Sequence, residues 1–166
     1  KNLDSKFDLY FFMPNKISNI AVLTSGGDSP GMNAAVRAVV RTCAFHNVGC
    51  FGVFQGYQGL IDNKMESMNA RSVKDIINKG GTILKSARCL EFRTPKGRKM
   101  AYNNLKKNNI DGMVVIGGDG SFTGAMIFQK EFSFPVLGIP GTIDNDIQGT
   151  RFTLGYDTAL NTVIDA

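Results

Sequence analysis

The chain has 166 residues, of which 43% are hydrophobic and 20% charged, and this balance excludes a disordered or fibrous protein. Nineteen Lys and Arg against 14 Asp and Glu give a net charge of +5, which suits nucleic acid, an acidic membrane or a phosphorylated metabolite equally. The longest stretch without a charged residue, 42–61, contains four glycines and two glutamines, so it is too polar to span a membrane.

The two ends of the chain differ in pattern from its middle. Residues 1–15 predict a disordered extension, and residues 16–166 predict one α/β domain. The last helical pattern of that domain, 160–166, stops without a capping glycine, as if the domain were incomplete there.

Three cysteines without a C-x-x-C motif and a single histidine leave no zinc site and favour a reducing, cytoplasmic setting. Basic residues are scattered, with groups at 96–99 and 106–107 that we interpret as solvated faces, so we expect neither a nucleic-acid nor a membrane partner.

Short apolar runs alternate with helical patterns from residue 17 onward. The runs predict strands at 20–24, 48–54, 112–116 and 136–139, and the patterns predict helices at 32–46, 73–78, 100–108 and 122–132. In the first helix, the residues expected to face the core are Ala34, Ala35, Ala38 and Val39. Nearly continuous apolarity indicates strands buried on both faces. The predicted fold is therefore α/β, a doubly wound, mainly parallel sheet in a Rossmann-like three-layer sandwich.

Three glycine-rich segments follow predicted strands. The first, TSGGDSPGMN at 24–33, joins a strand to a helix, where free N–H groups and the helix dipole favour phosphate. It is neither a G-x-G-x-x-G motif nor a Walker A loop. A tight strand-to-helix turn explains it equally well, so both interpretations stay open.

The second segment, IGGDGS at 116–121, places Asp119 between glycines. Glycine neighbours let a polyphosphate approach, and the carboxylate is a ligand for a hard cation such as Mg²⁺. The alternative is that Asp119 only caps the helix 122–132, but Ser121 is expected to supply that cap. The functional interpretation is therefore favoured.

The third segment, GIPGTIDND at 138–146, places Asp144 and Asp146 two residues apart. In an extended loop they share one side, so one carboxylate can accept a proton from a hydroxyl while the other organises charge. An Asx-turn is an equally good explanation of this segment alone.

The three segments together are more specific than each alone, because the carboxyl ends of parallel strands converge on one crevice. Arg88 lies in a loop-like stretch and is a candidate to stabilise charge on a transferring phosphoryl group, although an exposed or ion-paired arginine is the alternative. Arg37 and Arg41, four residues apart on the first helix, form a second cationic face that either binds an anion or is merely solvated.

These motifs resemble those of the bacterial-type ATP-dependent 6-phosphofructokinases. The resemblance covers residues 17–166 and rests on four segments in the family's order: TSGGDSPGMN at 24–33, GGTILKSAR at 80–88, IGGDGS at 116–121 and PGTIDND at 140–146. Family members are about twice as long as this chain, so the resemblance covers their N-terminal half. It implies a glycolytic phosphotransferase that moves the γ-phosphoryl group of MgATP to the 1-hydroxyl of fructose 6-phosphate.

The resemblance also implies roles for individual residues. Asp144 matches the general base, and Asp146 would support metal and geometry around it. The positions matching ATP contacts are Gly27, Arg88, Cys89, Gly118, Asp119, Gly120 and Ser121, with Asp119 as the magnesium residue. The positions matching contacts to the acceptor hydroxyl and the moving phosphoryl group are Thr142, Ile143 and Asp144. Among these, the catalytic set is Asp144, Thr142, Arg88 and Asp146.

The same resemblance implies which phosphoryl donor the protein uses and which ligands regulate it. Pyrophosphate-dependent relatives typically carry Asp at the position of Gly120 and Lys at that of Gly141, so two glycines favour ATP. Arg37 and Arg41 match effector-site arginines of a homotetramer regulated by ADP and phosphoenolpyruvate, although Ala70 replaces a further effector arginine. Two alternatives stay open: another kinase with a GGDG loop, of the NAD or lipid kinase type, and an inactive nucleotide-binding fragment.

Overall fold

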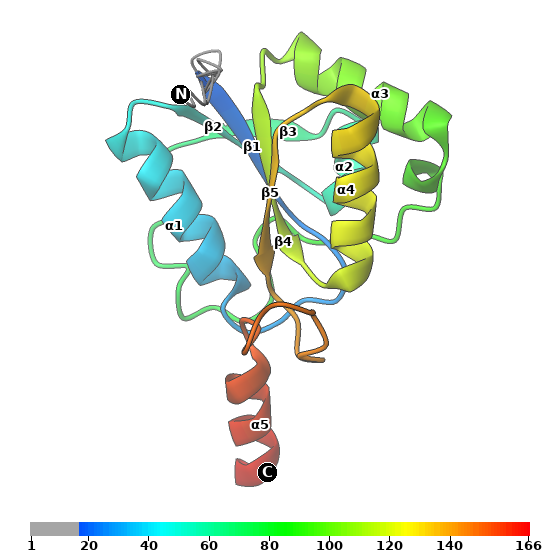
Figure 1. Ribbon diagram of the computed structural model, residues 1–166. Helices are drawn as coiled ribbons and strands as arrows, with labels where there is room; N and C mark the ends of the chain where they lie inside the picture. Colours follow the sequence, from blue (N-terminus) through cyan, green and yellow to red (C-terminus); the bar gives the residue numbers. More distant parts are fainter. Residues whose placement is uncertain (1–16) are drawn as a thin grey trace, which may run out of the picture.

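The computed structural model describes residues 17–166, and the predicted extension at 1–15 lies outside them (Figure 1). The strands are β1 (Asn19–Thr24), β2 (Gly49–Val53), β3 (Met65–Met68), β4 (Gly112–Gly117) and β5 (Val136–Pro140). The helices are α1 (Met32–Phe45), α2 (Gly56–Ile61), the short 3-10 helix η1 (Glu91–Arg93), α3 (Pro95–Lys107), α4 (Asp119–Phe132) and α5 (Tyr156–Asp165).

The five strands form one sheet in the order β3-β2-β1-β4-β5. β1 pairs in parallel with both β2 and β4, β5 is parallel to β4, and β3 runs antiparallel to β2. The chain thus winds outward from β1 in one direction and then, from β4, in the other. This confirms the doubly wound, mainly parallel sheet, and the switch between β1 and β4 opens a crevice at the carboxyl ends of the strands.

Helices cover both faces of the sheet. Figure 1 shows α1 on one side of the strands and α2, α3 and α4 on the other. Each face has its own core, with Val22, Val36 and Leu84 buried on the α1 side, and Leu23, Leu105 and Phe128 buried on the α4 side. The three-layer sandwich is therefore confirmed. None of the helices within residues 17–166 combines the length and hydrophobicity that a bilayer crossing requires.

Strand burial follows the prediction for the centre of the sheet but not for its edge. Ala21, Val22 and Leu23 of β1 are fully buried, as expected for a strand covered on both faces. Leu137 of β5 is 60% exposed, and within residues 17–166 no strand pairs with the outer edge of β5. The prediction that this strand is buried on both faces is therefore wrong for β5, although its side chains are apolar.

The buried face of the first helix and the helix predicted at 73–78 need correction, and α3 begins at Pro95 instead of residue 100. In α1 the buried apolar residues are Met32, Ala35, Val36, Val40 and Cys43, whereas Ala38 is exposed, because the face that packs on the sheet runs through positions 32, 36, 40 and 43 and Ala38 lies off it. The predicted helix at 73–78 is a series of turns, with Asp75 at a positive φ of 56°. Val73 and Ile76 still insert into the core, so their spacing of three residues imitated a helical face.

The small elements α2, β3 and η1 were not predicted from the sequence. α2 is only six residues long and contains two glycines, so its propensity is poor. Close packing explains the glycine at position 59, because a Cβ on Gly59 would lie 1.8 Å from the Phe54 carbonyl oxygen. Asn104 of α3 donates to the Leu60 and Ile61 carbonyls at 2.9 and 2.8 Å, which satisfies the end of α2.

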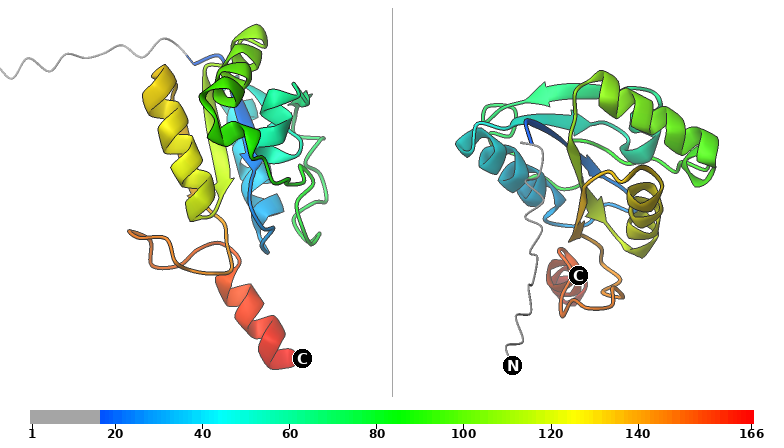
Figure 2. Two further views of the ribbon diagram at one scale, coloured as in Figure 1. Left: turned by 90° about the vertical axis from the view of Figure 1, so that its right-hand side faces the viewer. Right: turned by 45° about the horizontal axis from the view of Figure 1, so that its top comes forward.

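The projecting end of the described chain is α5. Figures 1 and 2 show it extending away from the sheet below β5, and none of its residues is buried. The prediction of a helical pattern at 160–166 is thus confirmed, with the helix beginning earlier, at Tyr156. The division into an extension and an incomplete domain stays a prediction.

One buried hydrogen bond joins α2 to α4. The Tyr57 hydroxyl donates to the Ser121 carbonyl at 2.6 Å, and burial raises the pKa of Tyr57, so the hydroxyl stays protonated. Tyr57→Phe removes this bond without changing ring volume. We expect it to lower the free energy of opening of α2 and the first turn of α4 by about 1 kcal/mol, measured by native-state amide hydrogen exchange. Tyr102→Phe is the control, because its hydroxyl makes no hydrogen bond within residues 17–166; equal losses in both variants would contradict the assignment.

Candidate active site

The three predicted glycine and aspartate segments meet at the carboxyl ends of β1, β4 and β5. A cleft of about 1200 Å³ lies there, between these loops, the stretch 86–93 and the first half of α4. Every residue predicted to bind ATP, to contact the acceptor or to act in catalysis lines it, namely Gly27, Arg88, Cys89, Gly118, Asp119, Gly120, Ser121, Thr142, Ile143, Asp144 and Asp146. The convergence expected from the strand pattern is therefore observed.

The first two loops touch through their backbones. The Ser25 N–H donates to the Ile116 carbonyl at 2.9 Å, directly beyond the paired ends of β1 and β4. A Cβ on Gly117 would lie 2.6 Å from the Ser25 carbonyl oxygen, so only glycine allows this approach. A Cβ on Gly27, by contrast, would have no atom within 4 Å, because this glycine borders open space in the cleft.

The amino end of α4 points into the cleft without a side-chain cap. Gly118 is the N-cap residue and Asp119 begins the helix, while Ser121 lies inside the first turn, where its N–H bonds to the Gly118 carbonyl at 3.1 Å. The expectation that Ser121 caps the helix is therefore wrong, because the helix starts three residues earlier than predicted. Uncapped N–H groups and the helix dipole make this end favourable for an anion.

The loop after β5 presents its two carboxylates to the cleft. Gly141 N–H donates to the Gly117 carbonyl at 3.0 Å, which joins this loop to β4. Asp144 and Asp146 are exposed, and within residues 17–166 neither carboxylate accepts a hydrogen bond or forms an ion pair. Asn145 between them has a positive φ of 50°, so the loop is not the extended segment we expected. Both aspartates line the cleft all the same.

Arg88 provides a cation that lines the same cleft. It is exposed, lies outside regular secondary structure and has no carboxylate partner among the described residues, so its guanidinium is available to an anion. Burial raises the pKa of the neighbouring Cys89 thiol, which therefore stays protonated and is not an activated nucleophile.

The apolar wall of the cleft was missed by the sequence analysis. Tyr57 and Phe92 stack with ring centroids 4.0 Å apart, and Ile127 of α4 completes this wall. A Cβ on Gly124 would lie 3.6 Å from both rings, an ordinary van der Waals distance, so the two rings lie directly against α4. A lone tyrosine in a glycine-rich stretch directly after a strand was the available signal.

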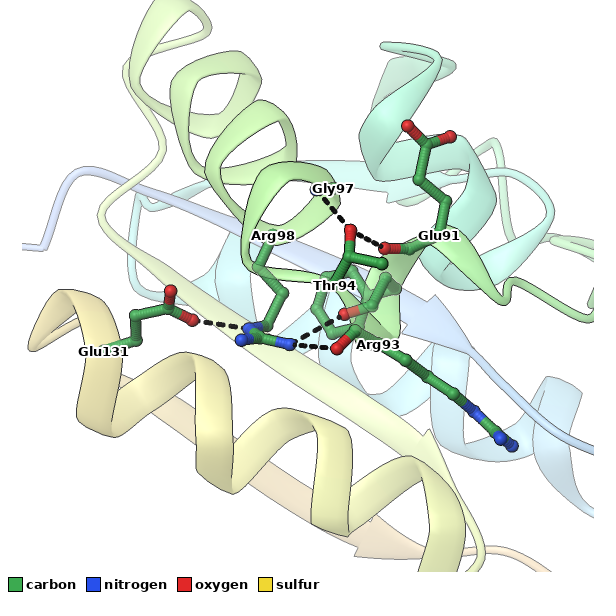
Figure 3. Close-up of polar contacts among 7 residues, drawn as sticks. Glu91, Arg93, Thr94, Gly97, Arg98 and Glu131 are labelled. Carbon is green, nitrogen blue, oxygen red and sulfur yellow. Dashed lines mark hydrogen bonds and ion pairs between the residues drawn. The ribbon is translucent and has the colours of Figure 1, made fainter.

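Figure 3 shows the polar contacts of Arg98 and Thr94 where η1, α3 and α4 meet. Arg98 of α3 is only 8% exposed and pairs through Nε with Glu131 of α4, while its Nη1 donates to the Phe92 and Arg93 carbonyls at 3.2 and 2.8 Å. Thr94 caps α3 by accepting from the Gly97 N–H at 3.1 Å. Our interpretation of residues 96–99 as a solvated face is therefore wrong for Arg98, which ties η1 to two helices.

Arg37 and Arg41 lie apart from this site. Both are on α1, whose core lies on the face of the sheet opposite to α4, and neither lines the cleft. Arg37 is half-buried and Arg41 is exposed, and within residues 17–166 neither forms an ion pair. The structure thus separates the two predicted anion sites.

No group of three or more His, Cys, Asp or Glu side chains within residues 17–166 forms a preformed metal site. Mg²⁺ is commonly held by one or two carboxylates together with substrate phosphates. The exposed Asp119 carboxylate at the start of α4 fits that arrangement, because it stands beside the end of the helix that attracts phosphate.

Several known proteins are similar to this chain in sequence and in fold. A family model described as Phosphofructokinase matches residues 19–166. The ATP-dependent 6-phosphofructokinase of Bacillus pumilus is 62% identical over 150 residues, covering 90% of this chain and 47% of that protein. ATP-dependent 6-phosphofructokinase 2 of Bacteroides thetaiotaomicron is 56% identical over 147 residues, covering 89% and 45%. The structure of phosphofructokinase from Saccharomyces cerevisiae superposes with a TM-score of 0.87 at 40% identity, covering 89% of this chain and 23% of that one.

The chain thus spans about half the length of the curated relatives it matches. The match extends through all four motifs, including residues 24–33 and 140–146. An origin among NAD or lipid kinases, which the GGDG loop alone left open, is excluded by this agreement. The chain belongs to the phosphofructokinase family.

Proposed function

We propose that the protein containing this chain is an ATP-dependent 6-phosphofructokinase, which transfers the γ-phosphoryl group of ATP to the 1-hydroxyl of fructose 6-phosphate. The observation that carries the proposal is the meeting of Asp144, Arg88 and the uncapped end of α4 in one cleft. Relatives named ATP-dependent 6-phosphofructokinase at 56 and 62% identity support the same substrates.

Each cleft residue then has a defined task. The Asp144 carboxylate, which is unpaired within the described residues, accepts the proton of the attacking hydroxyl. Arg88 stabilises negative charge on the moving phosphoryl group. Thr142 and Ile143 contact the acceptor, and Asp146 supports the geometry. Gly27, Cys89 and residues 118–121 border the nucleotide, with the first turn of α4 facing its phosphates.

Asp119 is the residue that would hold Mg²⁺. When bound, this ion neutralises charge on the β- and γ-phosphates. The N–H groups at the start of α4 face the phosphates, and the exposure of Asp119 leaves its carboxylate free to hold the ion beside them.

The first prediction from the proposed function concerns Asp144 as the general base. Asp144→Asn in the complete gene product keeps the side-chain volume but removes the proton acceptor. We expect kcat to fall by about 10²- to 10⁴-fold, with little change in the KM for ATP, in an assay that couples ADP formation to fructose 6-phosphate. Asp75→Asn is the matched control, since it removes the same charge from an exposed turn outside the cleft and Asn tolerates its positive φ.

The outcomes separate the alternatives. Full turnover in Asp144→Asn would remove Asp144 from the mechanism. A complete gene product that binds ATP but ignores fructose 6-phosphate would instead favour a nucleotide-binding protein without this kinase activity.

The second prediction concerns the donor. A Cβ on Gly120 would meet no atom within 4 Å, so glycine is not needed there for packing and an added side chain would occupy space beside the cleft. Gly120→Asp is therefore expected to raise the KM for ATP by at least about tenfold while the fold is retained, because a carboxylate repels the nucleotide phosphates. Gly80→Asp is the control, as it too is exposed with no atom within 4 Å but lies outside the cleft. Unchanged ATP kinetics in Gly120→Asp would contradict the placement of the nucleotide.

The third prediction concerns regulation. We propose that Arg37 and Arg41 bind an anionic effector such as ADP or phosphoenolpyruvate in a cytoplasmic homotetramer. Arg37→Ala combined with Arg41→Ala should abolish the effect of both ligands on fructose 6-phosphate saturation while kcat without effector is unchanged, because neither arginine lines the cleft. Lys107→Ala on α3 controls for lost surface charge. A normal effector response in the double variant would overturn the assignment.

A further inference from the structure

The loop that carries Asp144 is closed by a set of hydrogen bonds centred on Thr153. We name residues 141–154 the acceptor loop. Thr153 near its end is buried, with 4% of its surface exposed. Its hydroxyl donates to the Thr142 carbonyl at 2.6 Å, and its N–H donates to the Asn145 side-chain oxygen at 3.0 Å. One residue thus binds both the beginning of the loop and its centre.

These two partners lie on either side of Asp144 in the chain. Thr142 precedes it by two residues and also accepts the Asp144 N–H on its own hydroxyl at 3.2 Å. Asn145 follows Asp144 directly and has a left-handed φ of 50°, a conformation that asparagine tolerates better than most residues. Because both neighbours are tied to Thr153, the backbone at Asp144 is fixed from both directions.

Thr153 is itself anchored outside the acceptor loop. The next residue, Leu154, donates its N–H to the Pro140 carbonyl at 2.8 Å and accepts the Thr142 N–H at 3.1 Å. The Leu154 carbonyl also accepts the hydroxyl of Ser29, which is 2% exposed, at 3.0 Å. The loop after β1 therefore holds the support on which Thr153 depends.

We propose that Thr153 and Asn145 are positioning residues that hold the Asp144 carboxylate at the acceptor hydroxyl, an inference that rests on the function proposed above. Neither contacts the reacting atoms in this assignment. The Asp144 carboxylate is exposed and has no partner of its own within residues 17–166, so its position depends on the backbone that carries it. A displacement of about 1 Å at a reacting group can cost about 10²-fold in rate.

The test compares two substitutions at one buried site in the complete gene product. Thr153→Val keeps the branched shape and the backbone N–H but removes the hydroxyl, whereas Thr153→Ser keeps the hydroxyl. We expect Thr153→Val to lower kcat by about 10- to 100-fold with the KM for ATP within about twofold, and Thr153→Ser to retain most of the activity. Asn145→Gly, which removes the acceptor but permits the positive φ, should resemble Thr153→Val.

Two controls separate positioning from general damage. Thr150→Val removes another hydroxyl bond of the same loop, from Thr150 to the Phe152 carbonyl at 3.0 Å, and should leave kcat unchanged. In an Asp144→Asn background, Thr153→Val should have no further effect on the residual rate, because there is no base left to position.

The inference is overturned if Thr153→Val turns over like the unmodified protein, if Thr153→Ser loses as much as Thr153→Val, or if Thr153→Val lowers the Asp144→Asn residual rate by the same factor. Failure of the proposed function looks different. In that case the unmodified protein does not phosphorylate fructose 6-phosphate, or Asp144→Asn keeps full activity.

Discussion

The parallel pairing of β1 with β4 is the constraint on which the site depends. Thr24 at the end of β1 lies opposite Ile116 near the end of β4, so the two strands finish at the same level. The loops that follow must then pass close to each other, and they do so because Gly117 has no side chain. β5, paired with β4 in parallel, brings the third loop to the same edge. The adjacency of β1, β4 and β5 therefore brings Gly27, Asp119 and Asp144 to one edge of the sheet.

The apolar wall of the cleft, formed by Tyr57 and Phe92, belongs to the α4-side core. Phe92 stacks on Phe128 as well as on Tyr57, and Phe128 is fully buried. Arg98 adds the polar part of this support by satisfying two carbonyls of η1 that would otherwise lack a donor. A buried guanidinium is costly unless paired, and Glu131 supplies its pair. The apolar wall of the cleft is thus an extension of the hydrophobic core.

The charges in the cleft are unevenly distributed. Asp28, Asp119, Asp144 and Asp146 are exposed there, while Arg98 is already paired with Glu131. Arg88 and Arg93 remain as cations facing the same space. This balance makes the cleft a poor site for a bare polyphosphate and a better one for a polyphosphate that carries a divalent cation, in keeping with the role proposed for Asp119.

The sequence by itself determined the alternating pattern of strands and helices, the doubly wound sheet and the three segments that line the cleft. These features are local, since apolar runs, glycines and aspartates report on the element in which they stand. The main strands and the longer helices could therefore be predicted, and so could Gly27, Asp119 and Asp144 as neighbours, because parallel strands end at one edge. Arg88 was a candidate only as a cation in a loop and through the family resemblance.

Only the tertiary structure decided the rest. The helix α2, the turns at 73–78 and the buried face of α1 depend on contacts with residues distant in the chain or outside the element, such as Phe54 against Gly59. The roles of Tyr57, Phe92 and Arg98 arise from packing between α2, η1, α3 and α4. Thr153 carries no motif at all, and its importance is visible only because folding brings it to Thr142 and Asn145. Hydrogen bonds across a closed loop are set by the path of the backbone, and a linear pattern of residue types does not contain that path.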